Sequence, residues 1–327
     1  MRFLITGISG FAGSHLAAHL LDSGHEVFGV ARGADRDDAR RLRAIRGRHR
    51  DRLGPQAIRA CDLRDESRLR RIVREVRPDG VFHLAGIAFA PHAARDPAGA
   101  YQVNLLGSIA LLDAVLAGAP KARVVFPSSG EVYGWVEPRE LPITESQPLR
   151  PVSPYGVGKA AADLAAFQYF FSRGLDVVRV RPFNHTGPGQ SPDFVCSELA
   201  RAVAAAEAGA AEPVLRVGNL DVERDFTDVR DTVRGYLSLC DKGEAGEAYN
   251  LASGRSVRVR SILDRLRAAS RVELRVETDP AKLRPKEIPR VEVSVRKVRE
   301  ATGWAADIPL ERTLDDLLSW WRTELSG

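Results

Sequence analysis

Tyr155 and Lys159 are spaced for proton transfer within the run Ser153-Pro154-Tyr155-Gly156-Val157-Gly158-Lys159. Residues four apart lie one above the other on a helix face, so a helix here brings the phenol beside the ammonium. A nearby positive charge favours the phenolate and lowers a tyrosine pKa from its usual value of about 10. We therefore expect Tyr155 to pass a proton at neutral pH. Such a pair is common on solvated helices, so the interpretation depends on the residues around it.

A glycine-rich turn lies near the start of the chain. The apolar run from Arg2 to Thr6 predicts a buried strand, and apolar residues at helical spacing over 11–22 predict a helix after the turn. Glycine lets the backbone turn tightly and lets a pyrophosphate approach the free N–H groups of a helix N-terminus. The setting favours a dinucleotide site over glycines kept only for packing. The candidate cofactor contacts in the turn are Gly7, Gly10, Phe11, Ala12 and Gly13.

Two serines follow another apolar run. Residues 122–127 predict a strand, and Ser128 and Ser129 come directly after it. The carboxyl end of a parallel strand is where open α/β sheets bind ligands. A Ser129 hydroxyl at that edge could bond a substrate oxygen while Tyr155 delivers a proton. The alternative is that both serines only cap the following turn.

The elements that must position these residues alternate along the chain. Apolar runs predict strands over 2–5, 26–31, 56–60, 80–84, 122–127 and 175–181. Helical spacing covers 11–22, 65–76, 97–117 and 154–172. Such alternation predicts an α/β fold with a doubly wound, Rossmann-type parallel sheet and helices on both faces.

The character of the sequence changes after Arg181. Residues 182–190 are rich in turn formers, a helix is expected over 193–208, and helix 227–239 and strand 248–251 return to the sheet. We therefore expect a dinucleotide-binding domain over 1–181, to which the chain returns at about 226–253. A smaller, discontinuous C-terminal substrate domain would lie within 182–327, with the substrate in the cleft between the two.

Composition restricts the function classes. The 327 residues carry a formal net charge of +5, and no apolar run approaches the about 18 residues of a membrane span. Cys61, Cys196 and Cys240 form no Cys-x-x-Cys motif, which favours a reducing cytoplasm. The chain begins directly with a strand pattern, so we expect no signal peptide and a cytoplasmic location. No His or Cys cluster has metal-ligand spacing, so we expect no metal site.

The segment from Arg32 to Arg52 is rich in arginine and aspartate. It has mixed charge and no aromatic residue to stack on bases. A solvated loop and helix explains it better than a nucleic-acid surface. The modest positive charge of the chain also suits an anionic nucleotide substrate and a phosphorylated cofactor.

The glycine turn, the strand-end serine and Tyr-x-x-x-Lys, in this order, resemble the extended short-chain dehydrogenase/reductase superfamily in its nucleotide-sugar branch. The resemblance covers essentially the whole chain. It implies that Ser129, Tyr155 and Lys159 are the catalytic residues, with Tyr155 as acid or base. It also implies that Lys159 holds the nicotinamide ribose and lowers the Tyr155 pKa, and that Pro182 contacts the cofactor.

The choice of cofactor depends on the residue after the second strand. An acidic residue there would accept from the adenosine ribose of NAD, whereas Arg32 can pair with the 2′-phosphate of NADP. NADP(H) is therefore favoured over NAD(H), although Arg32 could instead stack on the adenine. The resemblance implies that Asp62, followed by Leu63, binds the adenine amino group. It places Leu84, Ala85 and Gly86 along the cofactor, with Gly86 where the family usually has Ala.

Three later segments resemble nucleotide-sugar contacts. The first, 181–190, implies that Asn184 contacts the substrate diphosphate. The second, 217–229, implies Val217 and Asn219 at the base and Arg224 on a phosphate. The third, 283–289, implies Arg284 on the diphosphate and Glu287 on the ribose. An arginine fork suits a diphosphate, and a surface ion pair is the alternative for each arginine.

Across its length the sequence is most similar to the family of GDP-6-deoxy-D-mannose reductases, beside the GDP-mannose 4,6-dehydratases. This implies NAD(P)H-dependent reduction of the 4-keto group of GDP-4-dehydro-6-deoxy-D-mannose to GDP-D-rhamnose. Glu131 stands where dehydratases carry the base that removes the C5 proton, so a dehydratase or an epimerase with a tightly held cofactor stays open. Gly130 replaces the acid of some dTDP-glucose dehydratases, which disfavours that branch.

Two further expectations concern catalysis and assembly. A non-catalytic dinucleotide-binding protein is disfavoured because Ser129, Tyr155 and Lys159 are all present. The predicted helices over 97–117 and 154–172 are rich in Ala and Leu, and relatives pair through two such helices. We therefore expect a homodimer, with burial inside one subunit as the alternative explanation.

Overall fold

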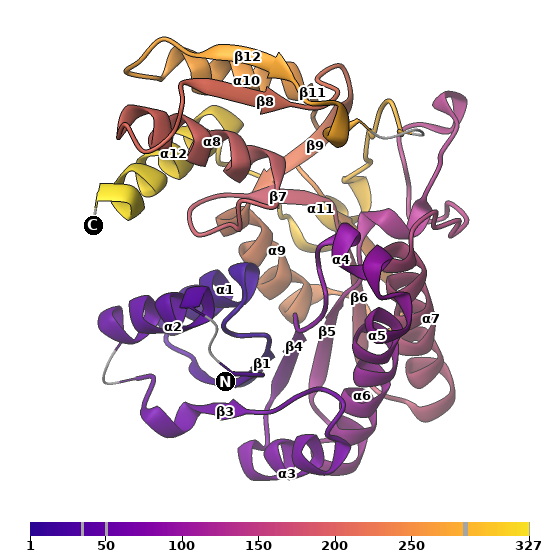
Figure 1. Cartoon of the computed structure of the whole chain (residues 1–327). Helices are drawn as coiled ribbons and strands as arrows, with labels where there is room; N and C mark the ends of the chain where they lie inside the picture. Colours follow the sequence, from indigo (N-terminus) through magenta and orange to yellow (C-terminus); the bar gives the residue numbers. More distant parts are fainter. Residues whose placement is uncertain (34–35, 50–51, 284–286, 327) are drawn as a thin grey trace.

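Seven parallel strands form the central sheet, in the order β10-β6-β5-β4-β1-β2-β3 (Figure 1). The computed structural model describes residues 1–33, 36–49, 52–283 and 287–326. Most of these strands are short apolar runs buried on both faces, as parallel sheets require. The predicted α/β class and Rossmann-type sheet are confirmed. The strands are β1 Arg2–Thr6, β2 Glu26–Ala31, β3 Ile58–Ala60, β4 Gly80–His83, β5 Arg123–Pro127, β6 Val177–Pro182 and β10 Ala248–Leu251.

Helices cover both faces of this sheet. Leu16 of α1 and Val233 of α9 belong to one buried apolar cluster, and Leu69 of α3 and Leu111 of α6 belong to another. The two clusters lie on opposite faces, so the sheet is the middle layer of the domain. The helices are α1 Phe11–Asp22, α2 Arg36–Arg48, α3 Glu66–Val76, α4 Ala90–Arg95, α5 Pro97–Tyr101, α6 Gly107–Gly118, α7 Pro154–Arg173 and α9 Val229–Lys242.

Local signals explain where two of these helices begin. Asp65 caps α3 by accepting a 3.0 Å hydrogen bond from the Arg68 amide. Ser153 caps α7 by accepting from the Gly156 amide at 3.0 Å, and Pro154 occupies the first turn. Tyr155 therefore lies at the very start of α7, at the sheet edge where β5 and β6 end.

The predicted helix over 97–117 is interrupted. Residues Gln102–Leu106 (η2) form a π-helical turn between α5 and α6. The stretch Pro97–Gly118 is apolar enough to span a membrane by length and composition, but half of its most apolar window is buried, and it packs on α3 and α7. It is a core helix of this domain.

A second group of elements lies above the sheet in Figure 1. Strands β7 Asn184–Thr186, β9 Glu223–Asp228 and β11 Ser256–Arg258 form a mixed sheet, and β8 Val214–Val217 pairs with β12 Arg275–Thr278. Their core contains Leu199, Ile262 and Trp321. The helices of this group are α8 Val195–Glu207, α10 Val259–Ala268 and α12 Leu310–Ser326. Helix α11 Arg296–Thr302 instead packs on α9 and β10 of the central sheet domain.

Candidate active site

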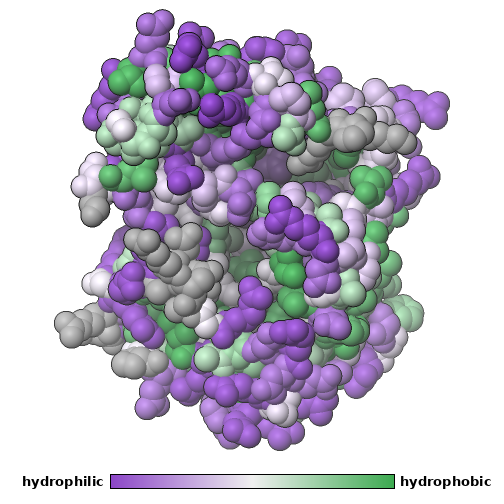
Figure 2. Space-filling model, in the orientation of Figure 1, coloured by the Kyte–Doolittle hydropathy of each residue, from purple (hydrophilic) through white to green (hydrophobic). Residues whose placement is uncertain are grey.

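The predicted site residues gather at one edge of the central sheet. Gly7 follows β1, Arg32 follows β2, Asp62 follows β3, Leu84 follows β4 and Ser128 follows β5. Because these strands are parallel, their carboxyl ends share that edge. The space-filling view shows a hollow on this face between the sheet and the second group of elements (Figure 2).

The glycine turn has no room for side chains. A Cβ on Gly13 would lie 2.1 Å from the Gly7 carbonyl oxygen, and one on Gly7 would lie 2.7 Å from the Ala85 amide nitrogen. Gly7 also has a φ of 74°, which favours glycine. Gly10 begins α1 without a side-chain cap, so the amides at this helix start are not covered by a capping side chain. This cradle fits the pyrophosphate of a dinucleotide.

Arg32 and Asp62 lie next to each other at the ends of β2 and β3. The Arg64 side chain donates two hydrogen bonds to the Asp62 carboxylate, at 2.9 and 2.8 Å, and these lower the Asp62 pKa to about 2. The positive charge of Arg32 contributes to this lowering. Leu63 is buried beneath them, in the core under α6. The exposed Arg32 thus lies at the edge of the sheet where the parallel strands end.

The loop after β4 reveals a residue that the sequence analysis missed. The Asn104 amide accepts from the Ile87 backbone N–H at 2.7 Å and donates to the Ile87 carbonyl at 3.0 Å. A Cβ on Gly86 would lie 2.9 Å from Asn104 Oδ1, which explains the glycine there. Asn104 comes from the π-helical turn. An asparagine inside an otherwise apolar helical pattern was the available signal.

Tyr155 and Ser129 meet at this edge. Tyr155 is only 9% exposed and packs against Ala93 and Ala100. Ser129 is 8% exposed, caps the short helix Gly130–Tyr133 (η3) and shares a hydrogen bond with Tyr155. Ser129 therefore caps the turn, which was the alternative considered for it, and it also contacts the phenol.

The expected effect of Lys159 on Tyr155 is not what the structure shows. Burial, together with the Glu131 carboxylate, raises the pKa of Tyr155 to about 12, and the Ser129 hydrogen bond opposes this rise; Lys159 is not among the causes. The Lys159 ammonium instead donates to the Pro127 carbonyl at 3.0 Å. Burial lowers the pKa of Lys159 to about 8, and the Asp163 charge opposes that shift. Desolvation outweighs the attraction between neighbours here.

Glu131 and Gly130 follow Ser129 in the same turn. Glu131 is exposed and accepts a 3.1 Å hydrogen bond from Ser153, the cap of α7. A Cβ on Gly130 would lie 2.6 Å from the Phe183 ring, so an acidic side chain has no room at this position. Glu131 is therefore the carboxylate that this turn offers next to Ser129.

The predicted substrate residues come from the second group of elements. Asn184 is exposed on β7, two residues after Pro182 at the end of β6, and Val217 ends β8. Asn219 donates a 3.0 Å hydrogen bond to Glu287, so two of the predicted contacts touch each other. Arg224 lies on β9, half-buried, and donates to the Glu223 carbonyl at 2.8 Å. Arg284 lies outside the described residues.

Two aromatic contacts join the two groups of elements. The Phe11 ring of the glycine turn stacks on His185 with centroids 5.9 Å apart, and Phe89 meets Phe194 edge-on at 5.6 Å. Neither pair could be predicted from local sequence patterns, because each joins residues more than 100 positions apart. Within the described part of the chain, no group of three His, Cys, Asp or Glu side chains could hold a metal ion.

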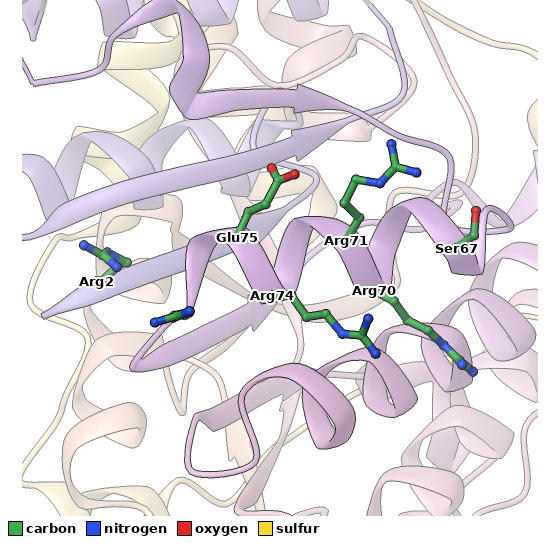
Figure 3. Close-up of a pocket in the computed structure, with 7 residues that line it drawn as sticks. Arg2, Ser67, Arg70, Arg71, Arg74 and Glu75 are labelled. Atoms are coloured by element: carbon green, nitrogen blue, oxygen red, sulfur yellow. The ribbon is translucent and has the colours of Figure 1, made fainter.

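A surface hollow of about 820 Å³ lies elsewhere, along α3 and the start of β1. Arg70 and Arg74 point to one side of the helix, whereas Arg71 and Glu75 point to the other (Figure 3). The hollow lies near the amino end of β1, away from Tyr155. It takes no part in the site described above.

Three comparisons agree on what this chain is similar to. The family model described as GDP-mannose 4,6 dehydratase matches residues 4–317. GDP-6-deoxy-D-mannose reductase from Pseudomonas aeruginosa is 37% identical over 99% of this chain and 98% of its own, and GDP-mannose 4,6-dehydratase from Sinorhizobium fredii is 29% identical over 96% of both. The solved structure of RMD from Pseudomonas aeruginosa complexed with NADPH has a TM-score of 0.83 and 36% identity, covering 99% of each chain.

Proposed function

The chain belongs to the GDP-mannose 4,6-dehydratase family of extended short-chain dehydrogenases/reductases, and from this membership we propose that it reduces GDP-4-dehydro-6-deoxy-D-mannose to GDP-D-rhamnose. Membership makes it an NAD(P)-dependent nucleotide-sugar enzyme. The observation that carries the proposal is the buried Tyr155 hydroxyl, bonded to Ser129 at the cofactor edge of the sheet.

The proposed chemistry uses the protonated state of Tyr155. Reduction of a ketone needs a proton at the oxygen as hydride reaches the carbon. Because its pKa is about 12, Tyr155 keeps its proton at neutral pH and can give it to the sugar O4. Ser129 donates to the same oxygen and stabilises the charge where it develops. When bound, NADPH supplies the hydride.

Several residues would hold the cofactor. The glycine cradle of Gly7, Gly10 and Gly13 receives the pyrophosphate, with Phe11 and Ala12 at the start of α1. Leu84, Ala85, Gly86 and Pro182 line the strand ends, and Lys159 binds the nicotinamide ribose. Asp62 and Leu63 lie at the adenine. Arg32 pairs with the 2′-phosphate, so NADPH is preferred to NADH.

The second group of elements would bind the nucleotide sugar. We assign it to a substrate domain within 182–327, separate from the dinucleotide domain over 1–181 and its return at about 226–253. Asn184 and Arg224 hold the diphosphate, together with Arg284. Val217 and Asn219 contact the guanine, and Glu287 contacts the ribose. Remote binding energy then positions C4 of the sugar.

One specific observation favours a second candidate function. Glu131 is an exposed carboxylate two residues after Ser129, where a dehydratase needs its base, and the matching family model is that of the dehydratases. In this case the cofactor would stay bound, and GDP-mannose or another nucleotide sugar would react without net reduction.

Two assays separate these functions. Purified enzyme is given GDP-mannose alone, and then GDP-4-dehydro-6-deoxy-D-mannose with NADPH. The reductase consumes NADPH in the second assay and leaves GDP-mannose unchanged in the first. Turnover of GDP-mannose without added NADPH would defeat the reductase proposal. Glu131→Gln should retain most of the rate of a reductase and lose that of a dehydratase.

We also propose a cytoplasmic homodimer that pairs through α7. Val157, Leu164, Phe167 and Phe171 recur at helical spacing on one face of α7, and Leu164 and Phe171 are 56% and 77% exposed. Hydrophobic side chains gather along the α7 edge in Figure 2. An exposed apolar stripe of this kind favours a partner helix.

All three cysteines are free and buried, which suits a reducing compartment such as the cytoplasm.

A further inference from the structure

The helix face that carries Tyr155 and Lys159 continues to a buried carboxylate. Asp163 follows Lys159 by four residues on α7, so it lies one turn further along the same face. Its side chain is completely buried. A buried charge is costly unless it is paired and hydrogen-bonded, so its partners decide what it does.

Four hydrogen bonds satisfy the Asp163 carboxylate. Oδ1 accepts from Arg179 Nη1 at 2.7 Å and from Arg181 Nη2 at 3.0 Å. Oδ2 accepts from Ser128 Oγ at 2.8 Å and from Arg181 Nε at 3.0 Å. Arg179 and Arg181 come from β6 and Ser128 from the end of β5, so one carboxylate ties α7 to two strands.

The same network holds both ends of the turn that carries Ser129. Ser128, its immediate neighbour, is bonded to Asp163. At the other end, Arg181 Nη1 donates to the Tyr133 hydroxyl at 2.9 Å, and Tyr133 donates to Asn250 at 2.7 Å. The position of Ser129 relative to Tyr155 therefore depends on a carboxylate that faces neither substrate nor solvent.

The charges around Lys159 give Asp163 a second effect. Tyr155 and His83 also lie near Lys159, but burial keeps both uncharged at neutral pH, lowering the His83 pKa to about 3. The charge of Asp163 counteracts the effect of burial on Lys159, and two guanidinium groups surround that carboxylate. Without the carboxylate, the charge that opposes the effect of burial on Lys159 would be lost, and the two guanidinium groups would lose the partner that they share.

We propose that Asp163 is a positioning residue of the active site, which fixes the Ser129 turn through Ser128 and Arg181 and places a negative charge one helix turn from Lys159. This rests on the proposed hydride-transfer function. It assigns a role to a residue on the helix face beyond the Tyr-x-x-x-Lys pair.

The test measures the protonation of the Lys159 side chain directly. The chain has six lysines, so carbon-13 labelling of the lysine side chains gives few resonances, and Lys159→Arg identifies the one from Lys159. In Asp163→Asn the Lys159 titration should move to lower pH by about 1 unit, the size of a nearby opposite charge. In Arg179→Gln it should move to higher pH, because a cation is removed. The control Asp113→Asn, which removes the carboxylate bonded to Tyr169 on α7, should leave it unchanged.

A second experiment separates the positioning role of Asp163 from the effect of its charge on Lys159. Ser128→Ala keeps the Asp163 charge but removes its bond to the Ser129 turn. We expect kcat with NADPH and the keto sugar to fall by about 10- to 100-fold while the Lys159 titration stays in place. If Asp163→Asn does not fold, Arg179→Gln and Ser128→Ala decide the proposal.

An unmoved titration in folded Asp163→Asn, an absent or opposite shift in Arg179→Gln, or an unchanged kcat in Ser128→Ala would overturn the proposal. The Lys159 titration is measured on the enzyme without a sugar substrate. Failure of the wild type to oxidise NADPH would therefore reject the reductase function and leave the electrostatic result intact.

Discussion

At the residue scale, burial decides which protons Tyr155 and Lys159 hold. Tyr155 and Lys159 share a helix face at the sheet edge, as their spacing predicted. The pattern cannot report burial, and burial sets both pKa values: about 12 for Tyr155 and about 8 for Lys159. The phenol is therefore an acid that keeps its proton, which suits reduction of a ketone better than its reverse.

Removal of the Tyr155 hydroxyl tests its role as the proton donor. Tyr155→Phe should lower kcat by about 100- to 10,000-fold, the range of a lost general acid, and leave NADPH affinity within a few-fold of the wild type. Steady-state kinetics and cofactor fluorescence measure the two effects. The matched control is Tyr169→Phe on the same helix, whose hydroxyl bonds Asp113 at 2.8 Å. A kcat for Tyr155→Phe equal to that of this control would contradict the assignment.

The pH dependence of the reaction should come from Lys159. Its pKa is lowered from the usual value to about 8, so the charged form that we propose to bind ribose is lost as the pH rises through that value. Because Tyr155 stays protonated there, kcat/KM should fall above about pH 8 on account of Lys159 alone. In Lys159→Arg the fall should disappear from this range, since arginine keeps its charge. A fall at the same pH in that variant would assign the titration to another group.

At the element scale, helix starts and strand–turn–helix units were predictable because their signals are local. Asp65 and Ser153 cap the helices that they precede, and the glycines of 7–13 stand where close approach leaves no room for a Cβ. The π-helical turn at Gln102–Leu106 was not predictable. Its Asn104 bonds Ile87, a residue brought near only by the folded sheet.

The apolar face of α7 predicts how two subunits pair. The double variant Leu164→Asp with Phe171→Asp places charges on the stripe and should convert the dimer to a monomer, because buried unpaired carboxylates are costly. Sedimentation velocity measures the change. The control is Val276→Asp, at an exposed apolar residue on β12 in the second group of elements. A monomeric wild type, or a double variant that still dimerises, would reject this interface.

At the scale of the whole molecule, the junction between the sheet domain and the second group depends on distant partners. Asp225 accepts from the backbone of 253–255, Asp228 from Thr313, and Asp231 from the amides of Asp307 and Ile308. These three buried carboxylates are spaced three apart in one short run. Nothing local distinguishes them from surface charges, so the sequence predicted the order of the elements but not what joins them.

The most direct measurement follows the hydrogen itself. The enzyme is given GDP-4-dehydro-6-deoxy-D-mannose and NADPH that carries deuterium at the transferable position of its nicotinamide, and the product is analysed by NMR. We predict deuterium at C4 of the sugar, one atom for each NADPH consumed. A product without the label, or conversion of GDP-mannose that needs no added cofactor, would contradict net reduction at Tyr155.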